Sequence, residues 1–424
     1  MRVLALRKTK QTIGLIGLLL AGWLLTGGTA VFAATPLDAG FFDFTYPSGT
    51  GGNGSTTAEK PESKLWYHDG SWWGVMWSTS ANSYTIHKLD WNTQTWSNTG
   101  VAIDDRKASL ADALADGNKL YIVSHIWTAT GATAGVGERG ELYRYSYSSG
   151  SYTLDSGYPF EINQAKTEAL TISKDSTGML WSTWVENATV MVAHSNASGG
   201  GDSDWTTPYV IPVDGTDVKS DDLSSVVAFD GYIGLMWSRQ KSGIDMHFAA
   251  HKDGTADNLW VTTIPYSTSG DDHMNLKSLQ SDNAGRLFAM IKTSLNAKLM
   301  QLLVCDSTAT SCTDPGDWTS HQVWDSTFVP TRPLLLIDTS NRELYIFARI
   351  RSGDTSLGDS IYYKKASLDN ITFDIADVGT PFIASTTYTS MNNPTGTKQN
   401  VNATTGMVVV ASDDRAKAYV HGCM

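Results

Sequence analysis

A hairpin pattern that returns seven times along the chain is the feature that most limits the possible folds. Each copy has a polar or charged residue, an alternating strand, a polar turn and a second apolar strand. The turns read D-G, D-x-x-G or a similar pattern, which is typical of β-hairpins because glycine tolerates a positive φ. The copies are "KLWYHDGSWWGVMWS", "DALADGNKLYIVSHIW", "EALTISKDSTGMLWSTWVE", "SVVAFDGYIGLMWSRQ", "KSLQSDNAGRLFAMIKTS", "RPLLLIDTSNRELYIFARIR" and "KQNVNATTGMVVVASDD".

A second, looser pair of strands follows each hairpin, as in "YTIHKLDWNTQTWSNTG" and "SIYYKKASLDNITFDIAD". A four-stranded unit that returns every ~50–65 residues has the period of a β-propeller blade. We therefore predict an all-β fold, a seven-bladed β-propeller of four-stranded antiparallel blades. The last unit ends one strand short, and the aromatic segment 41–47, "FFDFTYP", is expected to complete it as an N-terminal strand.

The first residues form a targeting segment. A basic start containing Arg2, Arg7 and Lys8 precedes an apolar stretch and "AVFAA", which offers a cleavage position after Ala33. We predict a signal peptide over 1–33 and a single propeller domain over 34–424, with no membrane span after signal removal and a secreted, periplasmic or extracellular location. In such an oxidising compartment Cys305 and Cys312 are expected to form a disulfide, with two free thiols as the alternative.

The amino-acid composition limits the classes of molecule that the protein could bind. The net charge of −12 argues against nucleic-acid binding, which requires a basic face. Charged residues make up only 17% of the chain, so any place where they gather is notable. Linker-like segments are absent between the units, and we expect a monomer.

In a propeller, the loop entering each inner strand and the loop leaving the second strand open on the same face, at the mouth of the central channel. The hairpin starts and the ends of the second strands therefore predict two converging rings. The first ring is Lys64, Asp112, Glu168, Ser225, Lys277, Arg332 and Lys398. The second ring is Trp77, His125, Trp184, Trp237, Lys292, Arg349 and Ser412. Such a cluster either binds a ligand or consists of channel charges that pair with each other and with water.

These residue types suit an acidic polysaccharide as the partner. Tryptophan faces stack on sugar rings, and cations hold carboxylates. The predicted substrate-binding residues are Lys64, Trp77, Trp184, Trp237, Arg239, His273, Lys277, Lys292, Arg332, Arg349 and Lys398. The predicted catalytic residues are Asp112 and Glu168, as the carboxyl pair of a glycoside hydrolase, or His125, as the base of a lyase. Trp66, Trp72 and Trp73 are expected to be core residues.

Two alternatives to an enzyme remain open at this stage, a non-catalytic glycan- or protein-binding propeller at the cell surface and a purely structural propeller. No cofactor is assigned. Asp221/Asp222 and Asp271/Asp272 could hold a structural calcium, although acidic pairs in loops are more often solvated.

The array resembles the sialidase-like (BNR-repeat) propeller superfamily, which includes sialidases and polysaccharide lyases such as ulvan lyases. Remnants of its repeat turn stand at Ser203–Trp205 and Gly316–Trp318. The resemblance implies arginines that hold a carboxylate, a role that matches Arg332 with Arg239 or Arg349, but no Tyr–Glu nucleophile pair can be assigned. The chain is also similar to a group of exported bacterial propeller proteins with the signatures "KLWYHDGSWW", "DDHMNLKSLQ" and "TKQNVNATTG". This second resemblance implies no particular activity for the chain.

Overall fold

A computed structural model describes the chain from Ala34 to the C-terminus with short internal gaps. The described residues are 34–57, 60–129, 132–133, 135, 137–196, 202–241, 245–267, 278–293, 295–306, 311–351 and 357–424. The predicted signal peptide, His273, Lys277 and the pair Asp271/Asp272 lie outside them.

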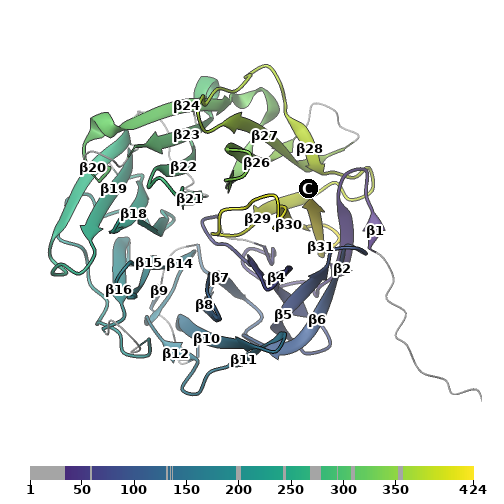
Figure 1. Cartoon of the computed structure of the whole chain (residues 1–424), viewed down its shortest axis with the longest axis horizontal. Helices are drawn as coiled ribbons and strands as arrows, with labels where there is room; N and C mark the ends of the chain where they lie inside the picture. Colours follow the sequence, from purple (N-terminus) through teal and green to yellow (C-terminus); the bar gives the residue numbers. More distant parts are fainter. Residues whose placement is uncertain are drawn as a thin grey trace, which may run out of the picture. The chain divides into compact units, whose positions relative to one another are not determined.

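The described residues form the predicted seven-bladed propeller (Figure 1). Blade 1 contains β3 (Leu65–His68), β4 (Ser71–Ser78), β5 (Ser83–Asp90) and β6 (Thr95–Ala102). Blade 2 contains β7 (Ser109–Asp116), β8 (Lys119–Ile126), β10 (Glu141–Ser148), β11 (Ser151–Leu154) and β12 (Phe160–Glu161). Blade 3 contains β14 (Leu170–Lys174), β15 (Leu180–Glu186) and β16 (Thr189–His194), and β9 (Ala132–Thr133) pairs separately with β13 (Ala165–Lys166).

Blades 4 to 6 are regular four-stranded sheets. Blade 4 contains β17 (Ser224–Phe229), β18 (Tyr232–Arg239), β19 (Asp245–Lys252) and β20 (Trp260–Ser267). Blade 5 contains β21 (Ser278–Ser281), β22 (Leu287–Lys292), β23 (Met300–Cys305) and β24 (Trp318–Trp324). Blade 6 contains β25 (Thr331–Asp338), β26 (Glu343–Arg351), β27 (Asp359–Ser367) and β28 (Thr380–Ile383).

Blade 7 joins the two ends of the described chain. Its order is β1 (Thr35–Pro36), β2 (Phe41–Thr45), β31 (Ala418–Cys423), β30 (Val408–Asp413) and β29 (Met391–Thr395). Phe41 pairs with His421, and the His421 Nδ1 lies 2.7 Å from Asp43 Oδ1 within the sheet. The prediction that an N-terminal strand closes the last blade is confirmed.

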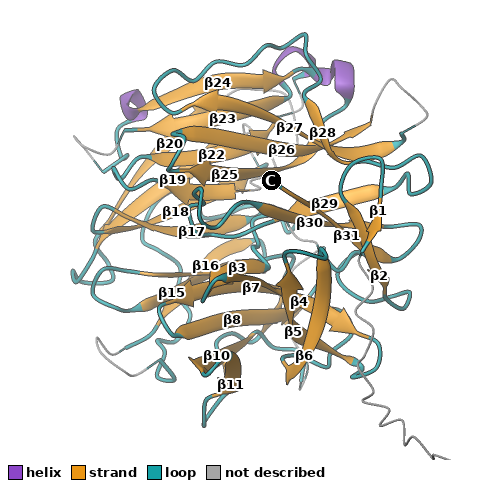
Figure 2. Ribbon diagram, turned by 45° about the vertical axis from the view of Figure 1, so that its right-hand side comes forward, coloured by secondary structure: helices purple, strands orange, loops and turns teal. Residues whose placement is uncertain are grey.

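Strands and loops make up nearly all of the drawn chain, and the helices are the short 3-10 turns η1 (Asn296–Lys298), η2 (Pro315–Asp317) and η3 (Ser326–Phe328) (Figure 2). None of the helices in the described ranges has the length and hydrophobicity needed to span a bilayer. Buried apolar side chains of the strands pack between neighbouring blades. Trp66, Trp72 and Trp73 are among these core residues, each at most 2% exposed.

Local sequence explains the hairpins and one irregularity. At the tip of the first hairpin Asp69 and Gly70 both have positive φ (48° and 71°), which a D-G turn supplies at low cost. Blade 3 departs from the expected four regular strands, because the segment after β16 meets it through the isolated bridges Ser195↔Trp205, Val192↔Tyr209 and Thr189↔Asp217 and not through a continuous ladder. Pro208 and Pro212 lie in that segment and lack the N–H that a continuous ladder needs.

Cys305 and Cys312 form the expected disulfide, with their Cα atoms 5.9 Å apart. Both are fully buried beside Trp318, whose indole N–H donates to the Cys312 carbonyl. The bond agrees with folding in an oxidising compartment.

Candidate functional site at one end of the channel

The strand register brings most of the predicted site residues to one end of the blades. Leu110 pairs with His125, Leu170 with Trp184, Ser224 with Trp237, Thr331 with Arg349 and Asn392 with Ser412. In every case the residue that enters an inner strand lies opposite the residue that ends the second strand. We call this end of the blades the mouth.

A fully buried ionic network occupies the blade 1 and blade 2 side of the mouth. The Glu62 carboxylate lies 2.6 Å from His125 Nε2 and accepts a hydrogen bond from Lys64 Nζ at 3.0 Å. Lys64 also donates to the Ala111 carbonyl at 2.8 Å, and the Leu170 N–H approaches Glu62 at 3.3 Å. The side chains of Glu62, Lys64 and His125 are at most 3% exposed, so the network joins three blades from inside.

Asp112 also connects blades. Its carboxylate accepts from the backbone N–H groups of Ser63 (2.8 Å) and Ile172 (2.9 Å) and from Lys398 Nζ (2.9 Å). Burial raises the pKa of Asp112, and the Lys398 ammonium opposes that rise. Glu168, its predicted catalytic partner, forms an ion pair with Lys60. Both carboxylates therefore have cationic partners inside the protein.

A second cluster, which we call the arginine corner, lies where blades 5, 6 and 7 meet at the mouth. It consists of Lys292, Arg332, Arg349, Asn392, Asn393 and Asp414. Lys292 Nζ lies 3.5 Å from the Thr331 hydroxyl, next to Arg332, and Arg349 pairs with Asp359 and approaches the Asn392 carbonyl oxygen at 3.5 Å.

Arg332 is the unusual member of this corner. It is the second residue of the inner strand of blade 6 and has φ 55°, a left-handed conformation that a long side chain rarely adopts. Its Nε is buried without a hydrogen-bond partner among the described residues, and the same holds for the Oδ1 of Asn393, which has φ 46° on the neighbouring blade. Orphaned buried polar atoms and local strain together mark places where a ligand atom could complete the bonding.

Asp414 supplies a carboxyl group to the corner. It accepts a hydrogen bond from Asn392 Nδ2 at 2.6 Å. Burial raises its pKa, and the Asn392 hydrogen bond and the positive charges of Lys417, Arg332 and Arg349 oppose the rise. The corner thus combines cations with a carboxyl group whose proton is held more firmly than usual.

The predicted tryptophan platforms are enclosed by protein. Trp77, Trp184 and Trp237 are each 0% exposed. The Trp77 ring packs edge-on against Tyr84, the Trp184 N–H donates to Glu186, and the Trp237 ring stacks on His247 at 5.3 Å. We leave these three residues out of the candidate site because their faces are covered.

The remaining predicted residues are placed as follows. Arg239 lies on blade 4 and pairs with Asp217 at 3.1 Å, apart from the corner residues on blades 5 to 7. Asp222 accepts from the Lys219 and Gln240 N–H groups and from the Ser238 hydroxyl, so it ties a loop together. Within the described ranges, no group of three or more His, Cys, Asp or Glu side chains has the geometry to hold a metal ion.

Asn393 was expected at the mouth from its entering loop, whereas Glu62 and Asp414 were not identified from the sequence. The signals were present but weak: Glu62 lies two residues before Lys64, in the loop that enters β3, and Asp414 directly follows β30 of the last hairpin. Their importance depends on contacts between blades, which a single repeat does not reveal.

Comparison with known proteins shows which solved structures have a similar fold. No protein-family model matches the chain, and no curated protein matches its sequence. The propeller is structurally similar to the BP39L lectin from Burkholderia pseudomallei, with a TM-score of 0.52, 11% identity, and 86% of this chain and 97% of that chain covered. Similar structures also include the polysaccharide lyase Uly1 (TM-score 0.48, 9% identity, 92% and 93% covered) and an α-L-arabinanase from Penicillium chrysogenum (0.46, 10%, 80% and 100%). At such low identities the likeness shows the fold alone, and the predicted sialidase-like relationship stays a prediction.

Proposed function

We propose that this chain is an exported carbohydrate-binding propeller that holds an acidic polysaccharide at the arginine corner of the mouth. The observation that carries the proposal is Arg332, a strained arginine whose buried Nε has no partner among the described residues. Two further cations, Lys292 and Arg349, lie on the flanking strands. Guanidinium groups bind planar carboxylates with good geometry, so a uronate or sialate carboxylate suits this corner.

The contacts of the predicted catalytic residues favour binding over catalysis, because these side chains are already paired inside the protein. Asp112 has its two oxygens occupied by three donors, and His125 lies against Glu62 inside the protein. Groups that connect blades in this way stabilise the ring, and a substrate would have to displace them.

One observation favours an enzyme as the second candidate. Asp414 is a partly buried carboxyl group with a raised pKa beside Arg332 and Arg349, and such a group can act as a general acid or base. In this candidate Asp414 acts on the glycosidic linkage or on the sugar proton next to the bound carboxylate, as a hydrolase or a lyase does.

The binding proposal is tested with Arg332→Ala in native gels that contain polygalacturonate, alginate or a sialylated polysaccharide. We expect the wild-type protein to be retarded by at least one of them and the variant to bind about tenfold more weakly, because a charge-assisted hydrogen bond contributes about 1.5–3 kcal/mol. The same mixtures, followed for unsaturated product and for new reducing ends, test the second candidate.

Arg342→Ala is the matched control. Arg342 also lies on blade 6 with a left-handed φ of 54°, but at the opposite end of strand β25, where it pairs with Asp369. It should leave retardation unchanged. Equal retardation of the wild-type protein and the Arg332 variant, with both folded, would contradict the proposal.

A further inference from the structure

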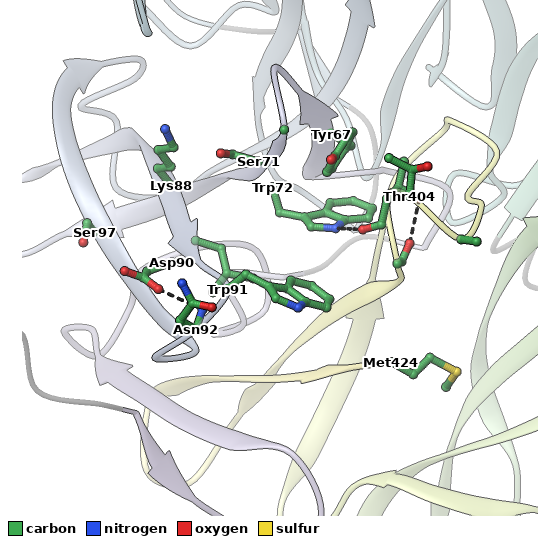
Figure 3. A pocket seen from close by; sticks show the side chains of 15 residues that line it. Tyr67, Ser71, Trp72, Lys88, Asp90, Trp91, Asn92, Ser97, Thr404 and Met424 are labelled. Carbon is green, nitrogen blue, oxygen red and sulfur yellow. Dashed lines mark hydrogen bonds between the residues drawn. The ribbon is translucent and has the colours of Figure 1, made fainter.

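A separate cavity lies between blades 7 and 1, at the end of the blades opposite to the mouth (Figure 3). Its volume is about 750 Å³, within the usual range for pockets that bind small molecules or short oligosaccharides. The tip of the first hairpin, the loop between β5 and β6, and the 403–406 turn of blade 7 form its walls. None of the arginine-corner residues lines it.

The exposed face of Trp91 is the main feature of this cavity. Trp91 is 45% exposed, whereas most other tryptophans of the described chain are buried. Figure 3 shows the indole rings of Trp72 and Trp91 both directed toward the blade 7 turn that carries Thr404. An exposed aromatic ring in the wall of a cavity offers an apolar face on which a ligand can stack.

Local contacts hold Trp91 in place. A Cβ atom at Gly406 would lie only 3.0 Å from the Trp91 Cη2, so the absence of a side chain there lets the ring edge rest on the backbone. The Trp91 carbonyl accepts from Gln94 Nε2 at 2.7 Å, and Asp90 accepts from the N–H groups of Asn92 (2.9 Å) and Thr93 (3.1 Å). The ring is therefore pre-positioned, which lowers the entropy cost of binding.

The rest of the lining combines apolar and polar groups. Trp72 is 2% exposed and ties blade 1 to blade 7, since its indole N–H donates to the Thr405 carbonyl at 2.7 Å. Lys88 and Asp90 add one positive and one negative side chain, and Asn92 and the hydroxyl groups of Ser71, Ser97 and Thr404 surround them. The side chains of the lining thus carry no excess charge.

We propose that this cavity is a second carbohydrate site, which binds a neutral pyranose unit of a glycan. The apolar C–H face of the sugar stacks on Trp91, while Lys88, Asp90 and Asn92 exchange hydrogen bonds with its hydroxyl groups. The balanced charge of the lining favours a neutral sugar over a uronate. The proposal stands independently of the function of the arginine corner.

The test is native electrophoresis in gels that contain neutral polysaccharides built from glucose, galactose, mannose or xylose. We expect at least one of them to retard the wild-type protein, and Trp91→Ala to weaken that retention by about tenfold or more, as is common when a central tryptophan is truncated. Trp91→Phe, which keeps a smaller ring, should fall between the two. Arg332→Ala should retain wild-type behaviour in these gels, which separates this site from the mouth.

Leu259→Ala controls for the loss of an exposed apolar side chain, because Leu259 is 57% exposed at the edge of blade 4. It should not change retention. If Trp91→Ala folds poorly, indole N–H resonances of the wild-type protein provide a second readout, with Trp91 assigned as the signal missing in Trp91→Phe. That signal should shift on adding an oligosaccharide from the retarding polymer. Absence of retention with every polymer, full retention by folded Trp91→Ala, or an unshifted Trp91 signal would each overturn the proposal.

Discussion

Three histidines illustrate how the position of a residue decides its chemistry. His125 lies against Glu62 between blades, His421 lies against Asp43 in the closing blade, and His87 lies among apolar and aromatic groups. His87 is 3% exposed and stacks on Phe44 with ring centroids 5.3 Å apart. Burial lowers its pKa to about 4. The neutral form of His87 therefore stabilises the fold.

His87 should make stability depend on pH. Because its pKa is lower in the folded protein than in the unfolded chain, its stabilising effect is complete above pH 6.5 and is lost as the pH falls toward about 4. The effect is on the order of 3 kcal/mol. His87→Phe should remove this part of the pH dependence, which is measured as the difference between wild-type and variant urea-unfolding free energies at pH 7 and pH 4.5. Parallel curves for the two proteins would exclude the effect.

Among the elements, the strands that close the ring depend most on contacts between distant parts of the chain. The inner hairpins are local in sequence, but β2 pairs with β31 across almost the whole chain. Asp43 is buried in that pairing, where burial raises its pKa and His421 opposes the rise. Since the edge of β31 would otherwise be open, the contacts of β2 both stabilise the ring and cover a strand edge.

Asp43→Ala tests this closure. Loss of the Asp43 carboxylate leaves the buried His421 Nδ1 without its hydrogen-bond partner, and we expect destabilisation of about 1–3 kcal/mol, measured by urea unfolding. Asp38→Ala is the control, because Asp38 lies nearby in an exposed turn and accepts one hydrogen bond, from the Thr386 N–H. Equal stability losses for both variants would show that the closing pair has no special role.

At the scale of the whole molecule, the ring separates two candidate sites to opposite ends of the blades. The arginine corner lies where inner strands begin on blades 5 to 7, and the Trp91 cavity lies at the hairpin ends of blades 7 and 1. A polysaccharide with acidic and neutral stretches could then be held at two points, which raises the overall affinity without new contacts.

The two sites should act independently. On an acidic polymer the double variant Arg332→Ala/Trp91→Ala should bind as weakly as Arg332→Ala, and on a neutral polymer as weakly as Trp91→Ala, because sites without shared partners couple by no more than about 0.5 kcal/mol. Affinity electrophoresis with acidic and neutral polymers, used separately, measures both losses. A single substitution that weakens both kinds of binding would show that the sites are coupled.

The sequence by itself determined the hairpins, their number and the closing strand, because D-G turns, alternating strands and the missing last strand are local or countable signals. It also indicated which residues gather at one end of the ring. Only the tertiary structure decided which of these side chains stay accessible: Trp77, Trp184 and Trp237 became core residues, and Asp112 became a link between blades. The physical reason is that burial and pairing depend on neighbouring blades far apart in the chain, and the strained Arg332 and the exposed Trp91 become visible only once those neighbours are in place.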